Sequence, residues 1–382
     1  MSAPKKRLRV AVLFGGRSAE HEISILSARN VVEALDRDKF DPVLVGIDKD
    51  GRWLVQEEAA LLGQSRDPRL VRLNAEMPEA TLVQRTSSPN PLSLKGEGEA
   101  AIDRSSGPLA VDVVFPVLHG PEGEDGCVQG MLTLAGLPFV GSGVLGSAVG
   151  MDKDVMKRLL VEAGIPTPAY RVVRASRFER ARRTVIEELA VLGSTTFVKP
   201  ANLGSSVGVS KAKTPAELEA AIDLALSFDD KALVEEAIPG VRELECAVLG
   251  NDEPIASRVG EIVVSHADGF YSYEAKYVDE HGATTKIPAD ISREDEEAIQ
   301  ALAIRTFVAL ELAGLARIDF FRSDAGALYV NEPNTIPGFT AISMYPKLWE
   351  ASGIPPRELV SRLVELAVER AERRRKLKSS VR

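Results

Sequence analysis

The sequence is poor in cysteine, histidine and aromatic residues. Its 382 residues include two cysteines and four histidines, and aromatic side chains make up 5%. Cys127 and Cys246 cannot cross-link a chain of this length, so we expect a reducing, cytoplasmic compartment. Scattered cysteines and histidines also argue against structural zinc. Any metal is expected to be bound by carboxylate and amide oxygens, which favours magnesium or manganese.

Long apolar runs are missing as well. No run approaches the ~18 residues that a membrane helix needs. The basic N-terminus is followed by only five apolar residues, 10–14, which is too short for a signal peptide. A net charge of −9 argues against attraction to nucleic acid. The basic stretch 370–382 permits a nucleic-acid tail, but we interpret it as a solvated helix end. We therefore predict neither a membrane nor a nucleic-acid partner.

What is present is an ordinary globular composition, with 45% apolar and 27% charged residues. At ~100–200 residues per domain, two or three domains are expected. Residues 9–14 read as a buried strand, Ser18 as the cap of a following helix, and 42–47 as a second strand. This βαβ pattern predicts a parallel sheet, so we assign 1–150 to a Rossmann-like α/β domain. Residues 85–107 are rich in Ser, Pro and Gly, and we interpret them as an exposed insertion.

Beyond residue 150 the pattern becomes α+β, with strands and helices mixed. We predict two lobes there, 151–240 and 241–372, followed by a basic tail at 373–382. The expected helices cover residues 152–163, 216–227, 295–312 and 356–376. The expected strands cover 137–140 in the first domain and, later, 197–200, 232–235, 243–250, 255–264, 318–321 and 327–330.

Residues 199–208 (KPANLGSSVG) have the chemistry of a phosphate-binding loop. A strand ends in Lys199, and the small residues after it allow backbone N–H groups to approach an anion. The spacing does not match a Walker A loop. The alternative is an ordinary Gly-rich turn.

A second pattern places carboxylates on a hairpin. Alternation puts Arg317 and Asp319 on one face of a strand, and a turn at 324–326 returns Glu332 and Asn334 beside them. Two neighbouring carboxylates repel each other unless a cation lies between them, so the pattern favours magnesium. The alternative is a surface salt-bridge cluster. Gly338 follows shortly and is a candidate oxyanion donor through its backbone N–H.

Two further motifs contain glycine. His119 begins an acidic loop, 119–126, at the end of a strand, where parallel sheets bind ligands; a structural histidine is the alternative. Residues 141–146 (GSGVLG) match a dinucleotide fingerprint. They do not follow the first strand, and no acidic residue ends a later strand at the right distance, so we disfavour that interpretation.

Taken together, the motifs resemble the D-alanine–D-alanine ligases of the ATP-grasp superfamily, from residue 10 to about 346. The matching stretches, in family order, are 14–24 (FGGRSAEHEIS), 119–126 (HGPEGEDG), 141–143 (GSG), 151–153 (MDK), 204–208 (GSSVG), 271–277 (YSYEAKY), 317–319 (RID) and 331–338 (NEPNTIPG). The resemblance implies a two-lobed ATP-grasp domain after the α/β domain. It also implies ATP and D-alanine as substrates, two Mg²⁺ or Mn²⁺ ions, and a homodimer.

The resemblance implies a role for each matching residue. Those expected to bind ATP are Lys153, Lys199, Ser205, Ser206, Val207, Glu235 (adenine amino group), Glu243 (ribose), Phe270 and Lys276. Those expected to hold the metals are Asp319, Glu332 and Asn334. Those expected at the D-alanines are Glu20, His119, Arg317 and Ser343. Those expected to act in catalysis are Glu20, Ser205, Tyr277, Arg317, Gly338 and Ser343.

Alternatives remain open at the level of sequence. The resemblance links a tyrosine at position 277 to an amine acceptor, which favours D-alanine over D-lactate. A D-alanine–D-lactate ligase, another ATP-grasp carboxylate–amine ligase and a nucleotide-binding regulator without turnover are the rivals. Glu236 stands where the family commonly has lysine, which weakens any second adenine contact there.

Overall fold

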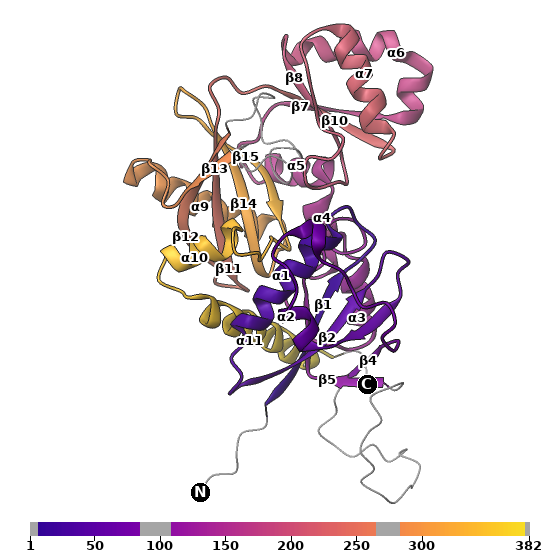
Figure 1. Ribbon diagram of the computed structural model, residues 1–382. Helices are drawn as coiled ribbons and strands as arrows, with labels where there is room; N and C mark the ends of the chain where they lie inside the picture. Colours follow the sequence, from indigo (N-terminus) through magenta and orange to yellow (C-terminus); the bar gives the residue numbers. More distant parts are fainter. Residues whose placement is uncertain (1–6, 85–107, 265–282, 379–382) are drawn as a thin grey trace, which may run out of the picture.

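The computed structural model describes residues 7–84, 108–264 and 283–378. Three main sheets each have their own set of helices. Figure 1 shows the second sheet along the sequence, at the top of the view, set apart from the other two. The predicted insertion at 85–107 lies outside the described residues, as do Phe270, Lys276 and Tyr277. Among the helices that are described, none is long and apolar enough to cross a membrane.

The first sheet is parallel at its centre, as the βαβ pattern predicts. Its strands, in spatial order, are β3 (Trp53–Gln56), β2 (Phe40–Ile47), β1 (Leu8–Gly15) and β6 (Val113–Pro116). Strand β1 is parallel to both β2 and β6, and helix α1 (His21–Ala34) makes the crossover. The apolar run of β1 is continuous because both faces of the strand are buried.

Two local predictions in this domain are wrong. Helix α1 begins at His21 without a side-chain cap, and the Ser18 hydroxyl instead accepts the N–H of Glu20 at 3.1 Å. The turn after β1 requires glycine at position 15, because a Cβ there would lie 2.2 Å from the carbonyl oxygen of Ile47. The predicted strand 137–140 is reduced to one parallel bridge, between Phe139 and Val114.

Shorter elements complete this part of the chain. They are α2 (Glu58–Leu62), the parallel pair β4 (Thr81–Gln84) and β5 (Pro108–Val111), α3 (Cys127–Leu134) and α4 (Val144–Met151). Residues 141–146, which match the dinucleotide fingerprint, lead into α4. A Cβ on Gly146 would lie 2.4 Å from the carbonyl oxygen of Glu311, so this glycine permits close packing between segments.

The central lobe is an antiparallel sheet covered by two helices. Helix α5 (Lys153–Glu162) precedes this sheet, but its Met156 and Leu160 pack in the core of the following one. The elements of the central lobe are β7 (Tyr170–Arg174), α6 (Ala175–Leu189), β8 (Thr196–Pro200), β9 (Ser210–Ala212), α7 (Pro215–Leu226) and β10 (Lys231–Glu236). The strand order is β7-β10-β8-β9. Phe178 of α6 and Ile222 of α7 pack on Val198 and Val234 of the sheet.

The C-terminal lobe carries the largest sheet, with strand order β13-β12-β11-β14-β15. Its elements are β11 (Arg242–Gly250), β12 (Ile255–Val264), β13 (Ala283–Lys286), α9 (Arg293–Ala309), β14 (Gly314–Arg322), β15 (Leu328–Asn334), α10 (Met344–Ala351) and α11 (Pro356–Arg375). Helix α9 packs its buried side chains, among them Ile299 and Phe307, against β11 and β14.

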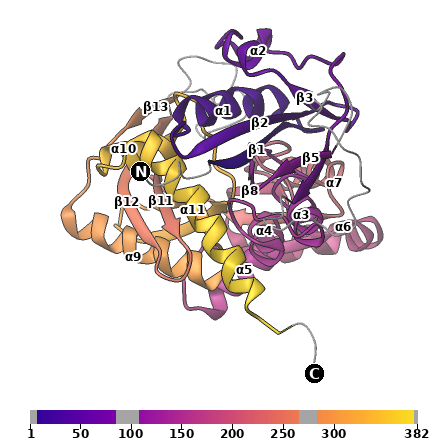
Figure 2. The same cartoon turned by 90° about the horizontal axis from the view of Figure 1, so that it is seen from below.

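Helix α11 belongs to the C-terminal segment but packs against the N-terminal domain. Leu359, Leu363 and Val364 share a core with Val12 of β1 and Val31 of α1. Figure 2 shows α11 running beneath the molecule, between the two parts. The lobe assignments made from sequence remain a proposal, but the first core is completed by residues more than 300 positions downstream.

The predicted solvated end of α11 needs a correction at Arg370. Its guanidinium donates to the carbonyl oxygens of Gly141 and Phe139 and lies 4.9 Å from the centre of the Phe139 ring. Burial lowers the pKa of Arg370 to about 10. Its long side chain reaches back across the domain junction, whereas Arg374 and Arg375 are exposed.

Candidate active site

The β14–β15 hairpin brings the predicted carboxylate cluster together. Asp319 lies opposite Glu332, and Arg317 lies opposite Asn334, in the antiparallel register. Arg317 binds both oxygens of Asp319 at 2.7 Å, and the Asn334 amide donates to Asp319 at 2.9 Å. Arg317 also lies 3.0 Å from Glu245 of β11, which the sequence analysis did not single out. The face expected from strand alternation is therefore present.

Two lysines from other segments meet this hairpin. Lys153, the first residue of α5, lies 3.2 Å from Glu332 and donates to the Leu203 carbonyl at 2.6 Å. Lys199, on β8, donates to the Asn331 side chain at 3.0 Å. Both ammonium groups are largely buried. Cations on α5 and β8 thus face polar side chains of the β14–β15 hairpin.

Glu235 occupies the buried centre of this cluster. Its carboxylate lies 2.5 Å from Lys199 and 2.8 Å from Lys157, which also donates to the Thr167 hydroxyl at 2.6 Å. Burial opposes ionisation of Glu235, but the two lysines outweigh it and lower its pKa to about 2. Burial lowers the pKa of Lys157. For Lys199 the carboxylates outweigh burial, and its pKa is raised.

The predicted phosphate loop has an unusual backbone. Ser205, Ser206 and Gly208 all have positive φ, near +53°, +58° and +70°. Val207, between Ser206 and Gly208, does not have a positive φ. Alternation of left-handed and other backbone conformations is the pattern by which anion-binding nests turn successive N–H groups toward one side. Glu243, on β11, is half-buried.

The far side of the loop approaches the N-terminal domain. A Cβ built on Gly204 would lie 4.0 Å from a carboxylate oxygen of Glu20, and one built on Gly120 would lie at the same distance. Glu20 therefore lies between the phosphate loop and the acidic loop that begins at His119. The expected joining of Glu20, Ser205 and Tyr277 cannot be followed further, because Tyr277 lies outside the described residues.

His119 and Glu124 of the acidic loop both bond to Ile336, which follows the hairpin. The His119 Nδ1 donates to the Ile336 carbonyl at 3.1 Å, and Glu124 accepts the Ile336 N–H at 3.3 Å. Burial lowers the pKa of His119, so the ring is neutral at pH 7. Burial and the nearby Glu20 carboxylate raise the pKa of Glu124 to about 8.

Gly338 and Ser343 lie side by side. A Cβ on Gly338 would lie 2.9 Å from the Ser343 hydroxyl, so a side chain at this position would displace it. The Ser343 hydroxyl accepts the N–H of Thr340 at 3.0 Å and bonds to the Thr340 hydroxyl at 2.8 Å. Both predicted residues thus lie in one tight turn before α10.

The donor chemistry of the hairpin fits magnesium. Asp319 and Glu332 contribute carboxylates. Asn334 contributes its amide oxygen, because the amide nitrogen is the atom that donates to Asp319. Oxygen ligands of this kind suit Mg²⁺, which completes its shell with phosphates and water. Among the described residues, no group of three or more His, Cys, Asp or Glu side chains could hold a metal alone. The set therefore suits a metal that arrives with a phosphate ligand.

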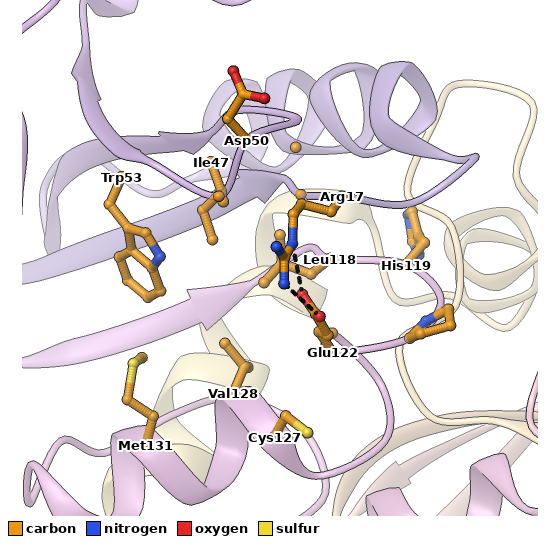
Figure 3. Close-up of a pocket in the computed structure, with 15 residues that line it drawn as sticks. Arg17, Ile47, Asp50, Trp53, Leu118, His119, Glu122, Cys127, Val128 and Met131 are labelled. Atoms are coloured by element: carbon orange, nitrogen blue, oxygen red, sulfur yellow. Dashed lines mark hydrogen bonds and ion pairs between the residues drawn. The ribbon is translucent and has the colours of Figure 1, made fainter.

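A cavity of 490 Å³ opens beside this site at the carboxyl ends of β1 and β2 (Figure 3). His119 lines it, and the Arg17–Glu122 ion pair, at 2.7 Å, stands at its centre in the view. Such an edge is where open parallel sheets bind ligands. Most predicted site residues lie outside the cavity lining.

Sequence analysis missed several members of this site. Lys157 was not predicted, although it lies four positions after the predicted Lys153 on α5, a spacing that puts both on the same helix face. Glu124 lies inside a motif that was recognised, but only the fold brings it to Ile336. Glu245 reaches Arg317 across neighbouring strands, which no local pattern indicates.

An anion-binding loop on an antiparallel lobe, facing a carboxylate hairpin on a second lobe, defines an ATP-grasp ligase. The chain belongs to the D-alanine–D-alanine ligase family. Residues 9–142 match the family of D-ala D-ala ligase N-termini, and residues 159–365 match the family of D-ala D-ala ligase C-termini.

Known proteins similar to the chain carry the same family name or a related one. A D-alanine–D-alanine ligase of Shouchella clausii is 50% identical over 376 residues, 98% of each chain. The D-alanine–D-alanine ligase structure from Coxiella burnetii has a TM-score of 0.80 and 38% identity, covering 97% of each chain. The VanG D-Ala:D-Ser ligase of Enterococcus faecalis has a TM-score of 0.75 and 35% identity, covering 95% of this chain and 100% of its own.

Proposed function

We propose that the protein joins two D-alanines into D-alanyl-D-alanine at the expense of ATP, for peptidoglycan synthesis in the cytoplasm. Family membership over nearly the whole chain supports this activity. The observation that carries it is the meeting of Lys153 and Lys199 with the Asp319–Glu332 hairpin. Cations and oxygen ligands from two lobes then surround a single binding site for a nucleoside triphosphate.

The first step is phosphoryl transfer. A carboxylate oxygen of the first D-alanine bonds to the γ-phosphorus, and the bond to the β–γ bridging oxygen breaks, releasing ADP. Lys153, Lys199 and the N–H groups of residues 205–207 hold the phosphates. Glu235 receives the adenine amino group, and Glu243 binds the ribose. Asp319, Glu332 and Asn334 would hold two Mg²⁺ ions, whose charge offsets that of the β- and γ-phosphates.

The second step is acyl transfer. The amine of the second D-alanine bonds to the carbonyl carbon of the acyl phosphate and loses a proton, and phosphate leaves. Arg317 and the N–H of Gly338 stabilise the oxyanion of the tetrahedral intermediate. Glu20 pairs with the ammonium of the first D-alanine, which lies near His119, and Ser343 binds the carboxylate of the second. Phe270, Lys276 and Tyr277 stay expectations from sequence.

The test is ADP release by the purified chain with Mg-ATP and single or paired acids. We expect release with D-alanine alone, no release with L-alanine, and dipeptide detected by mass spectrometry. Parallel assays contain D-alanine with D-lactate or with D-serine, because the alternative ligases differ from the proposed one in the acceptor that they use. ADP release only when one of these is added would replace the proposal with the corresponding ligase. A homodimer is the expected assembly, checked by light scattering in the same preparation.

A further inference from the structure

The backbone at both ends of the segment 336–339, which contains the Gly338 N–H, is hydrogen-bonded to side chains of the N-terminal domain. At one end, the N–H and C=O of Ile336 bond to Glu124 and His119 at 3.3 and 3.1 Å. At the other end, the N–H of Phe339 bonds to the Ser27 hydroxyl at 3.1 Å, and its C=O accepts from the Asn30 amide at 2.8 Å.

The two helix residues act from one face of α1. Ser27 and Asn30 are three positions apart, so both reach the same side of the helix. Ser27 is fully buried, and its hydroxyl also lies 3.5 Å from His119 Nε2. The bonds have a consistent direction. His119 donates through Nδ1 to Ile336, so its neutral ring accepts at Nε2 from Ser27, and the Ser27 oxygen accepts from Phe339.

Side-chain packing fixes the same segment. The Phe339 ring is 5% exposed and packs against Phe115 of the N-terminal domain and Tyr345 of α10, with ring centres 6.1 and 5.6 Å away. Pro337 has a φ restricted by its ring. Gly338 itself has no side chain that could hold its peptide in place. Its N–H direction therefore depends on the anchors before and after it.

We propose that Ser27 and Asn30 are positioning residues, which fix the segment 336–339 and thereby aim the Gly338 N–H at the developing oxyanion. This inference rests on the proposed ligation. It makes the N-terminal domain a part of the acyl-transfer machinery and not only a binding surface for D-alanine. Loss of either anchor affects acyl transfer more than phosphoryl transfer, because an oxyanion on carbon develops only in the second step.

The test compares Ser27→Ala and Asn30→Asp, singly and together, with two matched controls. Ser257→Ala removes another fully buried hydroxyl that accepts a backbone N–H, from Ala247 at 3.0 Å. Asn251→Ala removes another amide that donates to a carbonyl, that of Leu366 at 3.1 Å. Dipeptide and ADP are measured together, as is deuterium exchange in a peptide spanning 334–343.

In the double variant we expect dipeptide turnover to fall on the order of 10–100-fold, the scale for misplacing an oxyanion donor. The KM for ATP stays unchanged, and dipeptide formed per ADP drops below the wild-type ratio as the acyl phosphate is hydrolysed. Exchange at 334–343 rises in both single variants and in neither control. An unchanged product ratio with unchanged exchange would overturn the proposal.

The two proposals fail in different ways. A wild-type chain without D-alanine-dependent ADP release refutes the ligase function, and with it the purpose assigned to the anchors. The exchange measurement needs no turnover, so it still decides whether Ser27 and Asn30 hold the segment. A lowered product ratio without raised exchange would contradict positioning and place these residues in direct contact with substrate.

Discussion

At the scale of single residues, the site is built from charges that are buried only because they are paired. Glu235 lies between Lys157 and Lys199 with 2% of its surface exposed. Removing one partner of such a pair costs about 3–5 kcal/mol, because the other charge is left buried and alone. The pairing explains why this carboxylate can be buried without being neutralised by protonation. Its pKa of about 2 keeps it ionised through the physiological range.

Glu332→Gln tests the metal assignment at this scale. We expect turnover to fall by about 100-fold or more, because a bound metal contributes several kcal/mol to the transition state. The fold should survive, since glutamine has the same shape and Lys153 keeps its bond to Leu203. Turnover is measured against magnesium concentration, and folding by thermal unfolding.

Glu296→Gln is the matched control for that change. Glu296 of α9 is also partly buried and ion-paired, with Arg258 at 2.7 Å, but it bonds to β12 and not to the hairpin. Near-normal turnover of Glu332→Gln at saturating magnesium would remove Glu332 from the metal ligands.

At the scale of elements, the phosphate loop depends on the turn between α7 and β10. Asp229 accepts both the backbone N–H and the side-chain amide of Asn202, at 2.7 and 3.0 Å. Phe228 lies against Gly208, where an added Cβ would come within 2.8 Å of its ring. One turn therefore contacts both ends of the loop, which helps to keep the left-handed backbone of Ser205, Ser206 and Gly208.

Asp229→Ala is expected to loosen the loop. Two hydrogen bonds to Asn202 in the loop are lost, at about 1 kcal/mol each, together with a longer one, 3.3 Å, from the N–H of Lys231, so the KM for ATP should rise roughly 5–30-fold. The KM for D-alanine should change less. Steady-state kinetics with each substrate varied gives both values. Asp223→Ala, which removes a surface pair with Arg182 on the neighbouring helix, is the control. Equal changes in both KM values would point to a general loss of structure.

At the scale of the whole molecule, the N-terminal domain and the C-terminal helix share one hydrophobic core. Helix α11 supplies Leu359, Leu363 and Val364 to the core around β1. Arg370, near its end, binds the chain before α4. The segment 336–339 crosses the same junction in the opposite direction. The domain that binds D-alanine in our proposal is thus tied twice to the lobe that carries the catalytic hairpin.

Arg370→Ala tests this connection. We expect the free energy of unfolding to fall by about 1–3 kcal/mol, from two lost hydrogen bonds to carbonyls and a cation–π contact. Urea unfolding measures it. Arg374→Ala removes an exposed charge from the next turn and should leave stability within about 0.5 kcal/mol of wild type. Equal stability of the two variants would contradict a structural role for Arg370 and restore the interpretation of a solvated helix end.

The sequence alone determined the parts of this protein that depend on local order. Strand alternation placed Arg317 beside Asp319, and the following turn returned Glu332 and Asn334 to them, as the register shows. The apolar run of β1 and the crossover at α1 gave a parallel sheet. Such features follow from residue periodicity and turn chemistry, which act over a few neighbours. The family resemblance likewise needed only the order of its motifs, and family membership confirms it.

Only the tertiary structure decided which distant residues meet. Lys157 pairs with Glu235, 78 positions away, and Asn30 bonds to Phe339, 309 positions away. Arg370, whose sequence context is that of an exposed basic helix end, is half-buried instead and bonds to the carbonyls of Gly141 and Phe139. Contacts of this kind depend on how whole elements pack. Two side chains in similar local sequence can therefore lie one in solvent and the other in a core. Periodicity indicates the face of a helix or strand, but the neighbour of that face is set by the fold.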